Sequence, residues 1–247
     1  MRLTVLGAGP AYTDREGATG ACYHVTHGGT HVLLDLGQGS FPRIFPQVFP
    51  ADLDAVVVSH LHPDHFIDLV PLRHFLRYEF EPPRRVRVLG PGDLAARLDT
   101  LHAEAGFSAQ ALDTERLGED PRQIGSLQVQ GRLVAHTDES YAIRVAADGG
   151  PGLVYSGDCG RAEDIAPLVR PGDALLAEVS FGAGPVPRGV LHLDGPAVGR
   201  LATVARAGRV LLTHLLMGHD EGATLASVRA AYDGPVAFVW PGTSIDI

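Results

Sequence analysis

The sequence has 247 residues, 45% of them hydrophobic, which is typical of a globular protein with a substantial core. Its formal net charge of −9 argues against wholesale electrostatic binding of nucleic acid, and its two cysteines argue against a disulfide framework. Its apolar runs are strand-sized and its N-terminus lacks the long apolar region of a signal peptide, so we expect a cytoplasmic protein with no membrane partner.

Short apolar runs alternate with polar or glycine-rich turns and predict both strands and helices along the chain. In chain order, the pattern predicts strands over Arg2–Leu6, His31–Leu36 and Ala55–Ser59, a helix over His65–Tyr78 that is interrupted or bent at Pro71, a strand over Arg85–Leu89 and a helix over Gly92–Ala105. It then predicts strands over Leu127–Ala135, Tyr141–Val145, Leu153–Tyr155 and Ala174–Ala177, a helix over Gly195–Ala207, a strand over Val210–Thr213, a helix over Thr224–Ala231 and a strand over Val236–Val239. We therefore expect a single α/β domain over residues 1–247, with helices outside packed sheets.

Five of the predicted strands each run into a residue that can bind a metal ion. These residues are His60, His136, Asp158, Glu178 and His214. Loops that leave the strands of an α/β fold often gather at one edge and form the active site. The repetition of this pattern therefore predicts one shared site more strongly than any single residue could.

The densest group of potential ligands is the motif His60-x-His62-x-Asp64-His65, which directly follows a buried strand. Imidazole nitrogen and carboxylate oxygen suit Zn²⁺, and Mn²⁺ or Fe²⁺ less specifically. His60 and His62 can converge on one ion from a tight loop that Pro63 helps to fix. Asp64 and His65, at the start of the next helix, can turn to a second ion. A lone histidine here would be explained better as a solvated or capping residue, but the complete motif favours metal binding.

This motif, written in full as Ser59-His-Leu-His-Pro-Asp-His65, resembles the metallo-β-lactamase fold of dinuclear hydrolases, and the resemblance spans nearly the whole chain. It implies a four-layer αββα sandwich with two divalent metal ions at one edge, for which zinc is favoured and manganese or iron are alternatives. The implied ligands are His60, His62 and His136 for the first metal, Asp64, His65 and His214 for the second, and Asp158 as the bridge between them.

Two further residues resemble the RNase Z branch of that superfamily. In this branch a His-Glu-Ala-Thr segment and a later histidine form a proton-transfer pair, and Glu178 and His192 match its glutamate and its later histidine. Ala177 replaces the first histidine of the segment. The resemblance implies that His192 is the general acid and that Glu178 orients it and keeps it charged. The expected catalytic residues are Asp64, Glu178 and His192.

One departure from RNase Z concerns the substrate. Bacterial RNase Z carries a long arm that clamps tRNA, but the segment from Arg144 to Leu153 leaves room only for a hairpin turn. Together with the negative net charge, this argues against tRNA as the partner. We expect an armless, RNase Z-like phosphodiesterase that acts on small or cyclic phosphodiesters by attack of a hydroxide shared between the two metals. A homodimer is implied by the resemblance alone.

Several alternatives stay open at this point. An RNase Z-type tRNA 3′ endonuclease and a lactonase- or thioesterase-type carbonyl hydrolase would use a similar metal centre. A metal-binding scaffold without activity is disfavoured, because a degenerate member should lose ligands. Asp35 either holds a metal-binding histidine or caps a turn. The basic stretch Arg73–Arg87 is a solvated surface or a phosphate-binding rim, and His24, His27 and His31 are expected in a solvated hairpin.

Overall fold

The computed structural model describes residues 1–247 and contains fourteen strands in two seven-stranded sheets. The first sheet has the order β14 (Ser244–Asp246), β1 (Arg2–Gly7), β2 (Cys22–His27), β3 (Thr30–Leu34), β4 (Ala55–Val57), β5 (Val86–Gly90) and β6 (Leu112–Arg116). The second sheet has the order β13 (Val236–Phe238), β12 (Arg209–Thr213), β11 (Ala174–Glu178), β10 (Leu153–Tyr155), β9 (Tyr141–Ala147), β8 (Leu127–Leu133) and β7 (Arg122–Ile124). Each sheet is therefore built from one half of the chain, apart from β14, which returns to β1.

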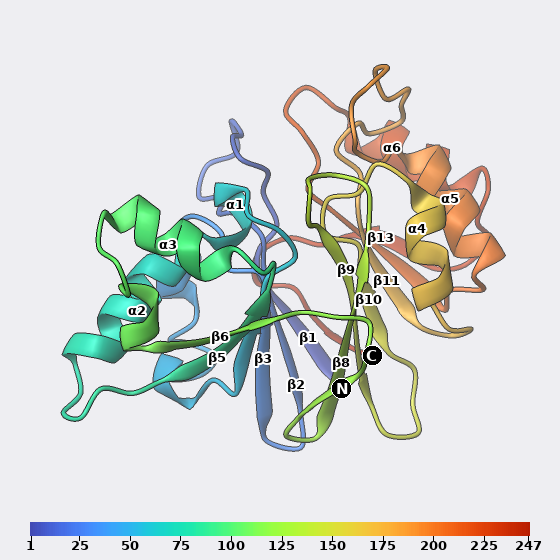
Figure 1. Cartoon of the computed structure of the whole chain (residues 1–247). Coiled ribbons are helices and arrows are strands. Elements are labelled where there is room, and N and C mark those ends of the chain that lie inside the picture. The colour runs from blue at the N-terminus through green and yellow to red at the C-terminus, as the bar shows by residue number, and fades with distance from the viewer.

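Helices cover the outer face of each sheet, as Figure 1 shows. The first sheet is covered by α1 (Pro63–Phe66), α2 (Leu69–Tyr78) and α3 (Leu94–His102), and the second by α4 (Ala162–Ile165), α5 (Gly195–Val204) and α6 (Glu221–Arg229). Short 3₁₀ helices are η1 (Phe41–Arg43), η2 (Pro50–Asp52), η3 (Ser108–Gln110) and η4 (Ala166–Leu168). The arrangement confirms the predicted four-layer αββα sandwich.

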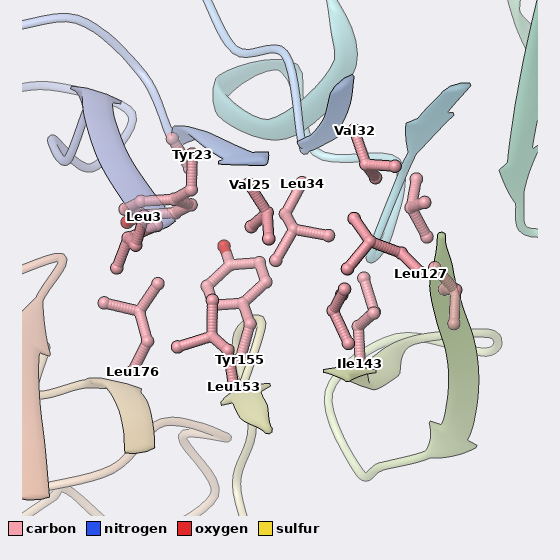
Figure 2. Packing of buried hydrophobic residues seen from close by; sticks show 14 of the residues in the cluster. Leu3, Tyr23, Val25, Val32, Leu34, Leu127, Ile143, Leu153, Tyr155 and Leu176 are labelled. Atoms are coloured by element: carbon pink, nitrogen blue, oxygen red, sulfur yellow. The ribbon is translucent and has the colours of Figure 1, made fainter. Parts of the chain in front are cut away.

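The main core lies between the two sheets (Figure 2). Side chains of successive strand residues point to opposite faces, so Val32 and Leu34 of β3 enter this core while Leu33 packs under the helices. All three are fully buried because both faces of the sheet are covered. Burying an aliphatic side chain of this size contributes roughly 1.5–3 kcal/mol, so these buried strands help to hold the loops that follow them in place.

Parallel strand pairing brings the predicted metal-binding segments to one edge of the sandwich. Strands β3 to β6 pair in parallel in the first sheet, and strands β10 to β13 do so in the second. Parallel strands all end at the same edge, so the loops after β4, β10, β11 and β12 leave the sandwich on one side. The ligand-bearing segments predicted from the sequence are among these loops.

The structure corrects several local predictions. The predicted helix His65–Tyr78 is two helices, and the interruption lies at Ile67 and Asp68 rather than at Pro71. Pro71 stands in the first turn of α2, where a missing N–H breaks no helical hydrogen bond. Strands β2, β6, β7 and β14 were not predicted. None of the helices is both long and apolar enough to cross a membrane.

The basic stretch also differs from the prediction. Arg73 is buried rather than solvated, and its Nε donates to the carbonyl oxygen of Phe107 at 2.9 Å. Arg85, just before β5, pairs with Asp113 of β6, and Arg87 of β5 pairs with Glu115 of β6. Because the charges of Arg85 and Arg87 are matched by these neighbours, that part of the stretch is better explained as strand-to-strand pairing than as a phosphate-binding rim.

Candidate metal centre

The structure brings all nine predicted site residues into one cluster at the shared strand edge. They are His60, His62, Asp64, His65, His136, Asp158, Glu178, His192 and His214. Their potential ligand atoms fall into three overlapping groups, and the atoms within each group lie within 4.8 Å of one another. Residues more than 150 positions apart in the sequence therefore share one site.

The loop after β4 delivers four of these residues. His60 is buried at the end of the strand, and His62 is the exposed N-cap of α1. Pro63 begins α1, where its fixed φ suits the first helical position. Asp64 and His65 follow within the first helical turn and point into the protein, where both are buried. The break between α1 and α2 keeps α1 to this one turn.

Asp158 stands between two sets of donor atoms. Its Oδ2 lies 3.8 Å from His60 Nε2 and 3.7 Å from His136 Nε2. Its Oδ1 lies 3.4 Å from His65 Nε2 and 3.6 Å from His214 Nε2. The two carboxylate oxygens thus face different histidine pairs, which is the arrangement expected of a bridging ligand.

The turn that presents Asp158 depends on Gly157, whose φ is +56°. A Cβ atom at this position would lie 2.8 Å from the Tyr141 carbonyl oxygen and 3.0 Å from Ser59 Cβ. Only glycine satisfies both the backbone angle and the close approach. His214 also has a positive φ, of 58°, although it is not glycine. Such a conformation is sparsely populated and is retained here beside the candidate site.

The remaining distances complete the two donor groups. In the first, which consists of His60, His62, His136 and Asp158, His62 Nδ1 lies 3.0 Å from His60 Nε2 and 3.1 Å from His136 Nε2. In the second, which consists of Asp64, His65, His214 and Asp158, Asp64 Oδ2 lies 3.5 Å from His65 Nε2 and 3.2 Å from His214 Nε2.

These donors fit divalent metal ions. Two nitrogen ligands bound about 2.0–2.1 Å from a tetrahedral zinc ion lie roughly 3.3 Å apart, close to the separations found here. Within the protein, His65 Nε2 and Asp158 Oδ1 are buried and have no hydrogen-bond partner. Buried polar atoms are otherwise almost always paired, so these two atoms point to a positively charged ligand between them.

Asp35 holds the candidate ligand His65 in place. It is fully buried at the end of β3 and accepts hydrogen bonds from His65 Nδ1 at 2.7 Å, Tyr155 Oη at 2.7 Å and Ser59 N at 2.6 Å. The bond to Nδ1 fixes the imidazole so that Nε2 faces the cluster. This contact supports the first of the two readings of Asp35, a partner that orients a metal-binding histidine.

Two orienting contacts were not predicted from the sequence. Ser180 Oγ donates to Glu178 and lies 3.1 Å from His214 Nδ1, so one hydroxyl connects a predicted catalytic residue to a predicted ligand. The Nδ1 of His136 donates to the Leu191 carbonyl oxygen at 2.7 Å. The serine two positions after Glu178 could have been found from the sequence. The Leu191 carbonyl could not, because every residue has a backbone carbonyl.

Glu178 and His192 form the predicted pair. His192 Nδ1 donates to Glu178 Oε1 at 3.0 Å and lies 3.9 Å from Asp158 Oδ2. Glu178 is buried and also accepts from the backbone N–H of Cys159 at 2.9 Å. Burial disfavours a charged His192, but its hydrogen bond to Glu178 outweighs this and raises the pKa of His192 above its ordinary value.

Comparison with known proteins places the chain in a family. A family model described as a beta-lactamase superfamily domain matches residues 30–215, which is most of the chain. The chain belongs to the metallo-β-lactamase superfamily. Members of this superfamily include metallo-hydrolases, and the clustered His and Asp side chains described above agree with that class.

Several known proteins are similar to this chain over nearly its full length. The uncharacterized protein ML1173 of Mycobacterium leprae is 30% identical over 253 residues, which cover 100% of this chain and 89% of the relative. The probable metallo-hydrolase YhfI of Bacillus subtilis is 27% identical, covering 98% and 100%. Its crystal structure has a TM-score of 0.87 at 23% identity, covering 99% of each chain. Ribonuclease Z of Haloferax volcanii is 24% identical over 302 residues, covering 100% and 95%.

Proposed function

We propose that this chain is a dinuclear metal-dependent phosphodiesterase acting on small or cyclic phosphodiesters. The observation that carries the proposal is the hydrogen-bonded pair of Glu178 and His192 beside the two donor groups. Metal ligands alone would serve carbonyl and phosphoryl centres equally. A histidine beside those ligands whose pKa is raised by its hydrogen bond to a carboxylate is suited to protonating an alkoxide leaving group.

The proposed ligand sets follow the geometry. His60, His62 and His136 would hold one ion, Asp64, His65 and His214 would hold the other, and Asp158 would contact both. Zinc is the proposed metal, because its preferred ligands are imidazole nitrogen and carboxylate oxygen. When bound, a metal pair supplies Lewis-acid charge to the phosphoryl oxygens and lowers the pKa of water.

The protein's own residues account for the proton transfers. Hydrolysis forms a P–O bond from water and breaks the P–O bond to the leaving alcohol, whose oxygen takes a proton from His192 Nε2. The Nδ1 of the same ring is committed to Glu178, so Nε2 is the available donor. The proton that the water releases restores the imidazolium. Asp64 is buried between His65 and His214, and its proposed catalytic role is to help hold the second metal ion.

The surroundings of the centre support a small substrate. The connection between β9 and β10 runs only from Asp148 to Gly152. Cavities of about 470 Å³ and about 570 Å³ are lined by His192 and by His62, respectively. These volumes lie in the range of sites for small organic ligands. The likeness to ribonuclease Z supports phosphodiester chemistry, while the short connection supports substrates smaller than tRNA.

The proposal is tested by metal reconstitution with Zn²⁺ or Mn²⁺ followed by a substrate panel. The panel contains bis(p-nitrophenyl) phosphate, cyclic nucleotides, a lactone, a thioester and a precursor tRNA. We expect turnover of the phosphodiesters. Turnover of the lactone or thioester without any phosphodiester would overturn the proposal, and efficient cleavage of the precursor tRNA would overturn the preference for small substrates.

The role of His192 has its own test. His192→Ala should lower kcat by about 10²–10⁴-fold for an alkyl leaving group, the usual contribution of a general acid. The loss should be much smaller for p-nitrophenolate, which leaves without a proton. His27→Ala is the matched control, since His27 is exposed on the β2–β3 hairpin. Equal losses for both leaving groups would remove the proton-donor assignment.

A further inference from the structure

A cavity with mainly apolar walls adjoins the candidate centre on the side of His192. It has a volume of about 470 Å³ and lies between α4, α5 and the segment that precedes α5. His192 lines it, and so does Gly160, which is two residues after Asp158. His192 lines the cavity and also lies close to Asp158 and Glu178, so the cavity adjoins the candidate centre at His192.

The walls of this cavity are mainly apolar. Eight of its fifteen lining residues are hydrophobic, and they include Ala162, Ala197 and Val190. A Cβ atom on Gly160 would lie 2.7–2.8 Å from Leu191, so only glycine lets this loop pack so closely where the cavity meets the centre. The cavity is therefore a built feature of the loops that also carry Asp158 and His192.

The charges around the cavity balance. Arg161 and Arg200 line it, and neither side chain makes an ion pair, but Glu163 and Asp194 line it as well. The Asp194 carboxylate is already committed to α5, where its Oδ1 accepts from the Ala197 N–H at 2.9 Å. Apart from His192, the cavity is lined by two side chains of each charge, so volume and apolar contact distinguish ligands here more than these charges do.

We propose that this cavity is the subsite for the leaving alcohol and that it selects alcohols with a bulky apolar body, such as an aromatic ring system. The inference rests on the proposed function. A general acid must lie within hydrogen-bond reach of the oxygen that it protonates, so the leaving group has to sit against His192. The second cavity, lined by His62 on the opposite donor group, carries Asp93, Asp138 and Glu139 and is less suited to an apolar group.

The test uses two methyl phosphodiesters whose leaving groups differ in size but little in acidity, one of phenol and one of 2-naphthol. With the metal-reconstituted full-length protein, kcat/KM should be about tenfold or more higher for the naphthyl ester, the scale on which a pocket discriminates added apolar groups. Ala197→Phe and Ala162→Phe each fill the cavity and should abolish this preference while the phenyl ester is still hydrolysed. Two separate variants guard against a folding defect in one of them.

The control is Leu101→Trp, which fills the second cavity instead. It should leave the ratio of the two kcat/KM values unchanged. Equal kcat/KM values for both esters in the wild-type protein, or a ratio that both cavity-filling variants preserve, would overturn the proposal. A ratio altered by Leu101→Trp alone would assign the leaving group to the other cavity and would also overturn it.

A binding measurement separates this proposal from the proposed function. Free 2-naphthol, followed by its own fluorescence, should bind the wild-type protein and should bind Ala197→Phe at least about tenfold more weakly. If binding behaves in this way but no phosphodiester is hydrolysed, the cavity stands as an apolar subsite and phosphodiesterase function falls. If phosphodiesters are hydrolysed but the substitutions change neither the affinity for 2-naphthol nor the ratio of the kcat/KM values, the phosphodiesterase function stands and the subsite is wrong.

Discussion

Two groups of neighbouring histidines in this protein have opposite electrostatic surroundings. In the candidate metal centre, burial disfavours a charged His65, but Asp158 and Asp35 outweigh it and raise the pKa of His65 well above its ordinary value. On the β2–β3 hairpin, His24 Nε2 lies 3.1 Å from His31 Nδ1, and the two rings are stacked. Burial and the neighbouring His31 lower the pKa of His24 to about 4.

The two histidine groups differ in whether carboxylate side chains lie beside them. No Asp or Glu lines the cavity beside the hairpin pair, and the nearby Asp54 carboxylate is bound to the backbone N–H of His31. The hairpin pair therefore offers only two nitrogen donors and no carboxylate, fewer ligands than a zinc site uses. The acids Asp35, Asp64 and Asp158 make one histidine cluster a centre suited to cations, whereas the hairpin pair, which has no such acids, is a packing contact.

The largest effect should come from removing the shared acid. Asp158→Ala takes one carboxylate oxygen from each donor group, so we expect both metals to be lost together. Activity should fall by roughly 10³-fold or more, the scale of losing a central electrostatic group. Metal content per chain and kcat/KM measure the outcome. Asp54→Ala, the matched change at the hairpin pair, should alter neither quantity. An Asp158→Ala protein that keeps two metals would show that Asp158 is not shared by the two donor groups.

The hairpin pair should instead reveal itself in the pH dependence of stability. The ordinary pKa of histidine is near 6.5, and that of His24 in the folded protein is about 4. Between these values the unfolded chain binds more protons, so the free energy of unfolding rises with pH, and His24 contributes at most about 3 kcal/mol to that rise. The full stability is present above pH 6.5 and declines as the pH falls towards 4.

Denaturant unfolding of wild-type and His24→Leu proteins from pH 7 to pH 4 checks this expectation. Both proteins lose stability as their shared acidic and metal-binding groups protonate, and the difference between the two isolates His24. The wild-type protein should lose more stability over this range. Identical slopes would mean that His24 is charged or exposed in the folded protein.

The sequence predicted which side chains gather at the strand edge better than it predicted the peripheral strands. His60, Asp158 and His214 could be found because each follows an apolar strand, and the geometry of parallel strands brings such ends together. Strand β14 was missed because it is only three residues long, two of which, Ser244 and Asp246, are polar and exposed, and it forms by pairing with β1. Its partner lies at the opposite end of the chain, where no local pattern could indicate it.

Contacts across the sandwich were equally hidden. His24 was expected to be solvated, but it is 3% exposed, because neighbouring elements cover the hairpin. Tyr155 reaches Asp35 from the other sheet, and the sequence separation of 120 residues gave no signal. Local chemistry identified which residues can bind a metal, whereas burial and orienting hydrogen bonds depend on packing between distant segments.

An intermediate effect should come from the acid that only orients a ligand. Asp35→Asn retains the size of the side chain but weakens its hold on His65 Nδ1 and changes the preferred tautomer. Loss of such a partner typically weakens metal binding by about 10–100-fold, and here the weakening should concern one ion of the two. Chelator competition would show one weakened site and one unchanged site. Two unchanged sites would mean that Asp35 serves the fold alone.

The smallest effect concerns the third group, Asp158, Glu178 and His192, whose atoms also lie close enough to hold a metal. This group combines carboxylates with a histidine, as the centre does, but His192 Nδ1 is engaged by Glu178. We therefore expect His192→Gln to leave the metal content unchanged, whereas His62→Ala should lower it. Metal analysis of both variants decides between a proton donor and a third ligand site. Loss of one ion in His192→Gln would show that His192 is itself a metal ligand. His192 could then not act as the proton donor.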